Sequence, residues 1–380
     1  MWRKYAIFGS GEGTAHGGQG YYPSDIRSAY RIPEDLDGSG QSIGILEFSN
    51  GFSLPDAQSF WRMHDIDPPD VQFISVDGTR NDHGQSRADQ EASLDLQWAG
   101  ALAPGAELLV YEAAGGRDYQ SFSIAMSKTL RYILDDTEHA PSVLSISYGD
   151  AEASFGDAVI KEWRDLIEQL DSAGVTVCVA SGDQGAYGRH TRPRPGETVG
   201  RNADAPASVP TCVAVGGTSL AADGSETAWS YHDRRNGGAS GGGFSNVFSR
   251  PDRQSDLQGP AGRGLPDVAF NADPATGYQI VFQQQNTVVG GTSVASPVFA
   301  AIVALANQAR TRDGHKPLSG LTRQLYTAAS SLPFNDITQG DNSYAGVQGF
   351  QAEPGWDACT GWGSLDARGF IEALRDRSPA

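Results

Sequence analysis

The chain has 380 residues, 39% of them hydrophobic and 19% charged, a globular composition that excludes an intrinsically disordered protein. Acidic residues outnumber basic ones by 46 to 28, and the net charge of −18 argues against nucleic-acid and membrane partners, which require basic surfaces. Three cysteines are too few, and odd in number, for a disulfide framework. No apolar stretch of transmembrane length is expected.

The first 21 residues are rich in glycine and predict a flexible N-terminal arm ahead of one catalytic domain over residues 22–380, with no prodomain. Apolar runs predict strands at 42–48, 71–76, 107–114, 143–149, 175–183 and 211–220. Helical patterns lie between them and beyond, at 55–64, 88–102, 119–135, 156–173, 294–310 and 367–375.

The strands are continuously apolar, which is typical of strands buried on both faces. Their alternation with helices predicts an α/β fold, a doubly wound and mostly parallel sheet flanked by helices. In such sheets the active site lies beyond the carboxyl ends of the strands.

Ser293 stands in GGTSVASP, just before an apolar helix. Gly290 and Gly291 permit a tight strand-to-helix turn, and the free N–H groups of a helix N-terminus favour an oxyanion. A lone serine here is more often an N-cap. The whole string Gly-Thr-Ser-x-x-x-Pro instead resembles the nucleophile segment of two peptidase families, the subtilisins and the sedolisins.

A serine nucleophile needs a base, which subtilisins supply with a histidine. Only His16 and His83 precede a glycine here, and the rest of the subtilisin string is absent. A histidine base is therefore the alternative hypothesis. The leading one is a carboxylate, because Glu91 and Asp95 are four residues apart on one predicted helix face among apolar neighbours.

The Glu-x-x-x-Asp helix followed by AGALAPGA resembles the sedolisin family of serine-carboxyl peptidases, which have a Ser-Glu-Asp triad on a subtilisin-like fold. The resemblance covers roughly residues 22–374. It implies Ser293 as nucleophile, Glu91 as base and Asp95 as its support. It also implies that Asp183, in VASGDQG, donates a hydrogen bond to the oxyanion. Family members extend the triad through a glutamate and a tryptophan, at the positions of Glu47 and Tyr148 here.

The resemblance further implies substrate contacts from Ser240, Gly241 and Gly242, and a preference for basic substrate residues through Asp204. It also implies one Ca²⁺ site in a C-terminal calcium-binding region. The side-chain ligands would be Asp336 and Asp357, and carbonyl ligands would come from Ile337, Glu353 and Gly355. Glu353 departs from the family, which has glycine there.

We therefore expect a serine-type endopeptidase that cleaves proteins or peptides through an acyl-enzyme. Its optimum is expected in acid, at about pH 4, because its base and its oxyanion donor are both carboxyl groups. A tripeptidyl peptidase of the same family and a histidine-dependent subtilisin are the alternatives. The resemblance also implies a monomer and a secreted or otherwise extracytoplasmic location.

Overall fold

The computed structural model describes residues 18–49, 51–189, 199–230 and 237–377, together with the backbone of two short strands nearer the N-terminus, Arg3–Lys4 and Ile7–Phe8. Its central sheet consists of β3 (Ser42–Glu47), β4 (Val71–Ser75), β5 (Glu107–Glu112), β6 (Val143–Ile146), β8 (Thr176–Ala180), β10 (Val213–Leu220), β11 (Glu226–Ala228) and β14 (Val268–Asn271).

The α-helices in the described residues are α1 (Pro23–Ala29), α2 (Leu54–Met63), α3 (Gln90–Leu102), α4 (Tyr119–Asp135), α5 (Asp157–Ser172), α6 (Thr292–Arg312), α7 (Leu321–Thr327) and α8 (Ala367–Leu374). Smaller sheets contain β1 (Arg3–Lys4), β2 (Ile7–Phe8), β7 (Tyr148–Ala151), β9 (Asp204–Ala205), β12 (Gly243–Ser249), β13 (Gly262–Leu265), β15 (Tyr278–Phe282), β16 (Gln285–Gly290), β17 (Phe334–Asn335) and β18 (Ser364–Leu365).

The central sheet has the order β11-β10-β8-β6-β3-β5-β4, with β14 also paired to β10. Every pairing in it is parallel except that of β10 with β11. The prediction of a doubly wound, mostly parallel sheet is confirmed. The chain passes from β3 to β4 and β5 on one side and then to β6 on the other, so the order reverses at β3, where ligands bind in such folds.

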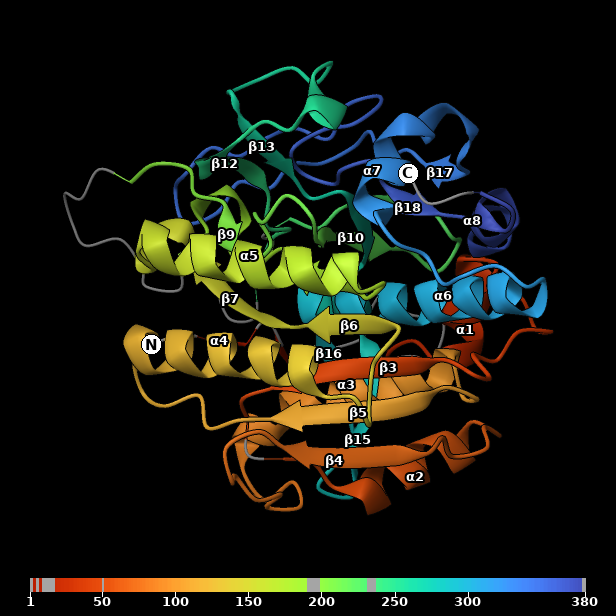
Figure 1. Cartoon of the computed structure of the whole chain (residues 1–380). Helices are drawn as coiled ribbons and strands as arrows, with labels where there is room; N and C mark the ends of the chain where they lie inside the picture. The colour runs from red at the N-terminus through yellow and green to blue at the C-terminus, as the bar shows by residue number, and fades with distance from the viewer. Residues whose placement is uncertain are drawn as a thin grey trace.

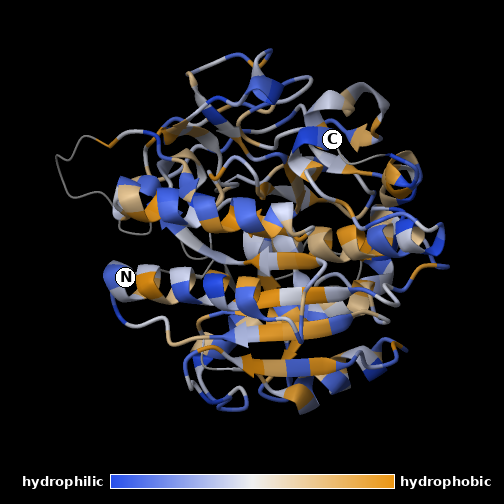
Figure 2. Ribbon diagram, in the orientation of Figure 1, coloured by the Kyte–Doolittle hydropathy of each residue, from blue (hydrophilic) through white to orange (hydrophobic). Residues whose placement is uncertain are grey.

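Helices cover both faces of this sheet (Figure 1). Helices α3 and α6 pack on one face and α4 and α5 on the other, and each face has its own apolar core. The hydropathy colouring in Figure 2 shows α4 and α5 as amphipathic, with hydrophilic and hydrophobic residues alternating along each helix. This layering places the carboxyl ends of β3, β5, β6 and β8 at one edge of the molecule.

Helix α6 corrects the expectation of no membrane-length segment, because it is long and apolar enough to cross a bilayer. All of its most apolar window is buried inside the protein, as in the core helix of a soluble fold. Its burial fixes the N-terminal end of α6, which carries Thr292 and Ser293, against the sheet.

The chain leaves the central sheet at Ser147, where a single strand over 143–149 was expected. Strand β6 ends at Ile146, and β7 begins at Tyr148 in a separate sheet with the order β1-β7-β9. Strand β1 pairs with β7 in the register Lys4↔Tyr148 and Arg3↔Gly149. Strand β2 pairs with β16 through Val289 and Gly290. These two strands lie within the segment predicted to be a flexible arm; the rest of residues 1–17 lies outside the described residues.

Candidate active site

Ser293 is the second residue of α6 and is wholly buried. The N-cap of this helix is Gly291, whose φ of 112° favours glycine, so Ser293 is not the cap. Its hydroxyl donates to the carbonyl oxygen of Ser147 at 3.4 Å, where β6 gives way to β7. The buried helix end therefore presents a serine hydroxyl to the carboxyl edge of the sheet.

Asp183 follows β8 and faces the same helix end. Its Oδ1 accepts hydrogen bonds from the Thr292 backbone N–H at 2.8 Å and from the Thr292 hydroxyl at 2.9 Å. Its Oδ2 has no hydrogen-bond partner among the described residues. Burial raises the pKa of Asp183 to about 8, although both bonds from Thr292 lower it. A neutral Asp183 can therefore donate from Oδ2, while its Oδ1 is held by Thr292, the residue before Ser293.

Glu91 and Asp95 lie on α3, which is buried along its whole length and packs against α6. The pKa of Asp95 is raised well above its usual range, first by burial and then by the charges of Glu47 and Glu91. The Asp95 carboxyl also lies in hydrogen-bond contact with that of Glu47, a bond that requires a proton on one of them. The predicted pair, Glu91 and Asp95, is therefore part of a larger carboxyl network that includes Glu47 on β3.

Tyr148 and Glu47, the two residues through which the resemblance extends the triad, are in contact. The Tyr148 hydroxyl donates to Glu47 Oε2 at 2.5 Å, and both side chains are wholly buried. Burial, followed by the charges of Glu47, Glu91 and Glu112, raises the pKa of Tyr148 well above its usual value. The phenol thus occupies the place of the expected tryptophan and supplies a hydrogen bond to the network.

Glu112 is a buried carboxyl that the sequence reasoning missed. It ends β5 and lies opposite Glu47 in the register of β3 and β5. The signal that could have found it is a charged residue inside the otherwise apolar string ELLVYEAA, since acidic residues are seldom buried without a specific partner.

The expected substrate residues lie close to Asp183 and are buried. The Ser240 hydroxyl donates to the Cys359 carbonyl oxygen at 2.7 Å, and the Gly241 N–H donates to the Gly182 carbonyl oxygen at 2.7 Å. A Cβ on Gly241 would lie 2.0 Å from the Ser181 carbonyl oxygen, so glycine is needed here for packing. Contacts of Ser240, Gly241 and Gly242 with substrate remain a prediction.

Asp204 lies on β9, whose partner is β7. Its carboxylate packs over Gly182 and Gly188, where added Cβ atoms would meet its oxygens at 2.2 and 2.8 Å. It is 2% exposed. Its role in selecting basic substrate residues also stays a prediction.

Of the two histidines considered as bases, the structure describes only His83. His83 is exposed, in a loop where its φ is 64°. This agrees with its reading from the sequence as a loop residue. His16 lies outside the described residues.

The expected calcium ligands lie around one C-terminal loop. Asp357 Oδ2 accepts from the Glu353 N–H at 3.0 Å, and Asp336 Oδ2 accepts from the Gly355 N–H at 2.8 Å. Both carboxylates thus hold the 353–355 segment, whose carbonyls, with that of Ile337, are the other expected ligands. Burial raises the pKa of Asp357 to about 6.

The donor set fits a hard cation such as Ca²⁺, which prefers carboxylate and carbonyl oxygens. Among the described residues no group of three or more His, Cys, Asp or Glu side chains could hold a metal, so such a site would depend on backbone carbonyls. Gly355 has a φ of 84°, whereas Glu353 is not among the non-glycine residues with positive φ. The departure from glycine at 353 is therefore compatible with the loop.

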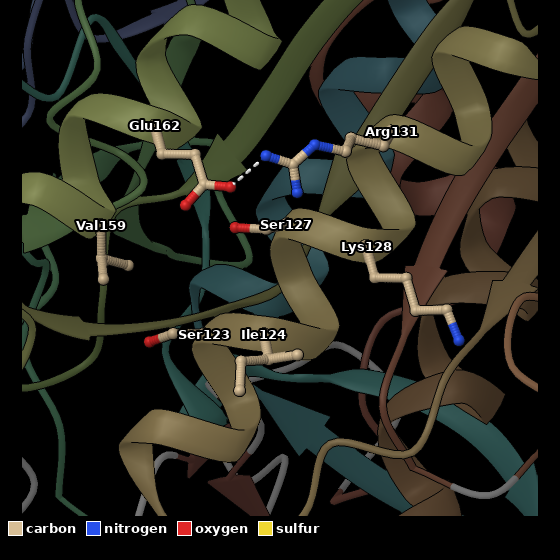
Figure 3. Close-up of a pocket in the computed structure, with 7 residues that line it drawn as sticks. All are labelled: Ser123, Ile124, Ser127, Lys128, Arg131, Val159 and Glu162. Atoms are coloured by element: carbon tan, nitrogen blue, oxygen red, sulfur yellow. Dashed lines mark hydrogen bonds and ion pairs between the residues drawn. The ribbon is translucent and has the colours of Figure 1, made fainter.

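A separate cavity of about 320 Å³ lies between α4 and α5 (Figure 3). Ile124, Lys128 and the ion pair of Arg131 with Glu162, at 2.5 Å, form part of its lining. None of Ser293, Glu91, Asp95 and Asp183 lines it, and it carries none of the chemistry described above.

Comparison with known proteins gives consistent results. The model of the subtilase family matches residues 56–363. Kumamolisin from Bacillus sp. (strain MN-32) is 38% identical over 370 residues, which cover 93% of this chain and 63% of kumamolisin. Sedolisin from Pseudomonas sp. (strain 101) is 32% identical, with 93% of this chain and 60% of sedolisin covered. Human tripeptidyl-peptidase 1 is 31% identical, with 93% and 64% covered.

The chain spans less than two thirds of the length of each of these relatives. Among solved structures, Pseudomonas sedolisin, a serine-carboxyl proteinase complexed with two molecules of pseudo-iodotyrostatin, superposes with a TM-score of 0.79 at 27% identity. The match covers 94% of this chain and 98% of that one. A lanthipeptide protease, with a TM-score of 0.58 at 16% identity, shares the fold alone. The chain belongs to the subtilase family, as a member of its sedolisin branch.

Proposed function

We propose that the protein is a serine-carboxyl endopeptidase that acts in acid. The observation that carries the proposal is the carboxyl of Asp183, held at Oδ1 by Thr292 and without a described partner at Oδ2, next to Ser293. A neutral carboxyl fixed in this way is a preorganised hydrogen-bond donor for a developing oxyanion.

In the proposed reaction, Ser293 Oγ attacks the carbonyl carbon of a peptide bond while Glu91 takes the hydroxyl proton. Asp183 Oδ2–H and the N-terminal end of α6 stabilise the negative oxygen of the tetrahedral intermediate. Glu91 then returns the proton to the leaving amine, and an acyl-enzyme remains on Ser293. A water molecule, deprotonated by Glu91, hydrolyses the ester and restores the serine.

The limits of the working pH range follow from which groups must hold protons. Glu91 has to be ionised to act as a base, whereas Asp183 and the Asp95–Glu47 pair have to hold protons. Because the pKa of Asp183 is about 8, its donor is lost as the pH rises through that value. Activity should therefore rise where the base ionises and fall towards alkaline pH.

The backbone around Ser293 supports a peptide as substrate. Strand β1 already adds to β7 as an antiparallel strand directly after Ser147, which contacts Ser293. Strand addition supplies affinity through main-chain hydrogen bonds and leaves the side chains to give specificity. An extended substrate strand that took the place of β1 beside β7 would cross the nucleophile.

A protein-digestion assay from about pH 3 to about pH 8 tests the proposal. Wild type should be most active in acid, Ser293→Ala and Glu91→Ala should be inactive, and His83→Ala should be unaffected. Equal cleavage by wild type, Ser293→Ala and Glu91→Ala would refute the assignment. Loss in His83→Ala with retention in Glu91→Ala would instead support a histidine-dependent subtilisin.

The tripeptidyl alternative differs in its need for a free substrate N-terminus. An endopeptidase cleaves an N-terminally acetylated peptide at internal bonds, whereas a tripeptidyl peptidase releases tripeptides only from the free form. We expect cleavage of both forms. The alternative gains support because one relative is a tripeptidyl-peptidase.

We further propose one bound Ca²⁺, held by the Asp336 and Asp357 carboxylates and by the carbonyls of Ile337, Glu353 and Gly355. The support is the convergence of both carboxylates on the 353–355 loop. When bound, the ion would neutralise these carboxylates and stabilise the loop. An acidic working range also suits an extracytoplasmic location, which we include in the proposal. We propose in addition that the protein is a monomer, and size-exclusion chromatography tests this.

A further inference from the structure

A buried glutamine of α3 is bonded to the hairpin formed by β15 and β16. Gln97 is wholly buried, and its side-chain amide makes two hydrogen bonds to one residue of β15. Its Nε2 donates to the Val281 carbonyl oxygen at 2.7 Å, and its Oε1 accepts from the Val281 N–H at 2.9 Å. We call these two bonds the Gln97 clamp. The amide contacts β15 as the backbone of a neighbouring strand would.

The clamp satisfies backbone groups on the edge of β15 that faces α3. Strand β15 pairs with β16 in the register Tyr278↔Val289 to Phe282↔Gln285. In an antiparallel pair, the N–H and C=O groups of alternate residues point away from the partner strand. Val281, which is 4% exposed, directs both groups to Gln97. Loss of the amide would therefore leave a buried donor and a buried acceptor to find new partners.

The two elements joined by the clamp lead to the two sides of the proposed reaction. Helix α3 carries Glu91, the proposed base. Strand β16 ends at Gly290, three residues before the proposed nucleophile Ser293. The Trp98 indole N–H adds a bond between α3 and β15, to the Gln279 carbonyl oxygen at 3.0 Å. These bonds therefore join the helix of the base to the hairpin that leads to the nucleophile.

We propose that Gln97 is a positioning residue of the peptidase site, whose amide holds α3 against the β15–β16 hairpin and so fixes Glu91 relative to Ser293. The inference rests on the proposed function. Gln97 touches neither the substrate nor Ser293 in this account. A misplacement of about 1 Å among reacting groups can lower the rate by about 10²-fold, so a clamp outside the site can affect the chemistry.

Gln97→Met tests the clamp directly, because methionine has a similar length and makes neither hydrogen bond. A looser clamp should alter the geometry of base and nucleophile without altering substrate binding. We therefore expect kcat to fall about 10- to 100-fold while KM stays the same. Steady-state kinetics well below the Tm measures both. A residue needed only for folding would lower the Tm and leave the kcat of the folded protein unchanged.

Gln254 provides a matched control, because it is also wholly buried and makes the same two bonds to one residue of β13. Its Nε2 donates to the Gly264 carbonyl oxygen at 2.8 Å, and its Oε1 accepts from the Gly264 N–H at 2.9 Å. Gln254→Met should lower the Tm and leave kcat close to that of wild type. An equal fall of kcat in Gln97→Met and Gln254→Met would overturn the inference.

Gln97→Glu makes the same clamp depend on pH. A protonated carboxyl can donate to the Val281 carbonyl oxygen and accept from the Val281 N–H, as the amide does, whereas a carboxylate can only accept. A buried glutamate keeps its proton above its usual pKa of about 4.3. In acid the variant should therefore have a kcat close to that of wild type. Its kcat relative to wild type should fall about 10- to 100-fold as the carboxyl ionises.

The comparison with wild type removes the titration of neighbouring groups. Helix α2 also contacts Gln97, because Trp61 Nε1 donates to the Gln97 carbonyl oxygen at 2.9 Å. The titratable groups on α3, on α2 with its C-cap and on β15 are Glu91, Asp95, Asp56, Arg62, His64 and Tyr278. Wild type contains all of them, so the ratio of the two kcat values reports the introduced carboxyl.

Thermal unfolding reports the ionisation of that carboxyl without any need for activity. Its pKa is higher in the folded protein than in the unfolded chain, so its contribution to stability is complete below about pH 4 and is lost as the pH rises. The Tm of Gln97→Glu relative to wild type should fall over the same pH range as its relative kcat. A Tm difference that changes with pH while the ratio of kcat values stays constant would contradict the inference.

Failure of the inference and failure of the proposed function give different results. If the proposed function is wrong, wild type is inactive or Ser293→Ala retains activity. If only the inference is wrong, wild type is active, Ser293→Ala is inactive and Gln97→Met has the kcat of wild type. Should Gln97→Met fail to fold, Gln97→Glu decides alone, because in acid it can make both bonds of the clamp.

Discussion

Carboxyls gather in two different arrangements in this molecule. At the carboxyl edge of the central sheet, Glu47, Glu91 and Asp95 face one another, and the pKa of Asp95 is raised by burial and by its acidic neighbours. Around the C-terminal loop, Asp336 and Asp357 instead face backbone N–H groups. The carboxyls of the first set repel one another when all are ionised, so some of them must hold protons. The carboxyls of the second set are arranged around backbone N–H donors and carbonyl oxygens.

The difference teaches what each region should respond to. Acids that face acids make a network whose hydrogen bonds depend on pH, which suits proton transfer. Acids that converge on a loop with carbonyl oxygens make a set that suits a hard cation. The two regions should therefore be separable, one by changes of pH and the other by removal of cations.

Loss of the base should have the largest effect. Glu91→Gln keeps the size of the side chain but cannot accept the serine proton, and we expect kcat to fall ~10⁴-fold. Steady-state kinetics at the wild-type optimum measures it. Asp56→Asn, a buried carboxyl in the first turn of α2, is a control that should change kcat little. Equal losses of kcat in both variants would mean that loss of any buried carboxyl lowers activity, and would contradict a special role for the carboxyl network at the sheet edge.

Loss of the oxyanion donor should come next. Asp183→Ala removes the group whose Oδ2 faces no described partner, and we expect kcat to fall by about 10²- to 10³-fold. Thr292→Val removes the hydroxyl that donates to Asp183 Oδ1 at 2.9 Å and accepts from the Gly182 N–H at 3.1 Å, but keeps the backbone bond to Asp183, and should cost about tenfold at most. A larger loss in Thr292→Val than in Asp183→Ala would contradict the assignment.

A smaller effect is expected from the hydrogen bond that the phenol donates to the network. Tyr148→Phe removes the 2.5 Å bond to Glu47, and we expect kcat/KM to fall about tenfold. Tyr111→Phe is a matched control, because its hydroxyl donates at 2.5 Å to the His139 carbonyl oxygen outside the network. If both variants lose the same activity, the loss is caused by altered packing and not by the missing hydrogen bond to Glu47.

Removal of calcium from the C-terminal loop of Asp336 and Asp357 should have the smallest effect on kcat and a clear effect on stability. A calcium chelator should lower the Tm of wild type by several degrees, because a bound ion stabilises only the folded state. Asp336→Asn should start from a lower Tm and respond less to chelator. Asp223→Asn, a turn aspartate that accepts from Ser225 N–H, should behave as wild type. No change in the Tm of wild type would contradict the calcium proposal.

The sequence predicts the fold well where patterns are local. Apolar runs located the six parallel strands β3, β4, β5, β6, β8 and β10, and α4 lies at its predicted bounds of 119–135. The break at Ser147 could not be predicted, because VLSISYG reads as one apolar strand and only tertiary pairing moves β7 into another sheet.

The candidate site shows the same limit. Motifs picked out Ser293, Glu91, Asp95 and Asp183, whose neighbours in sequence are distinctive. Glu112 was missed because its significance comes from the register of β5 on β3, which no local pattern contains. The role of Thr292 in holding Asp183 likewise depends on the approach of α6 to the end of β8.

The pH profile of kcat/KM for Asp183→Asn is the most direct test of the central claim, that a protonated carboxyl serves the oxyanion. Asparagine can accept from Thr292 and donate from its amide at any pH. The account predicts that this variant keeps activity in acid and extends its alkaline limb beyond the wild-type limb expected near pH 8. An unchanged alkaline limb, or a loss as large as that of Asp183→Ala, would contradict it.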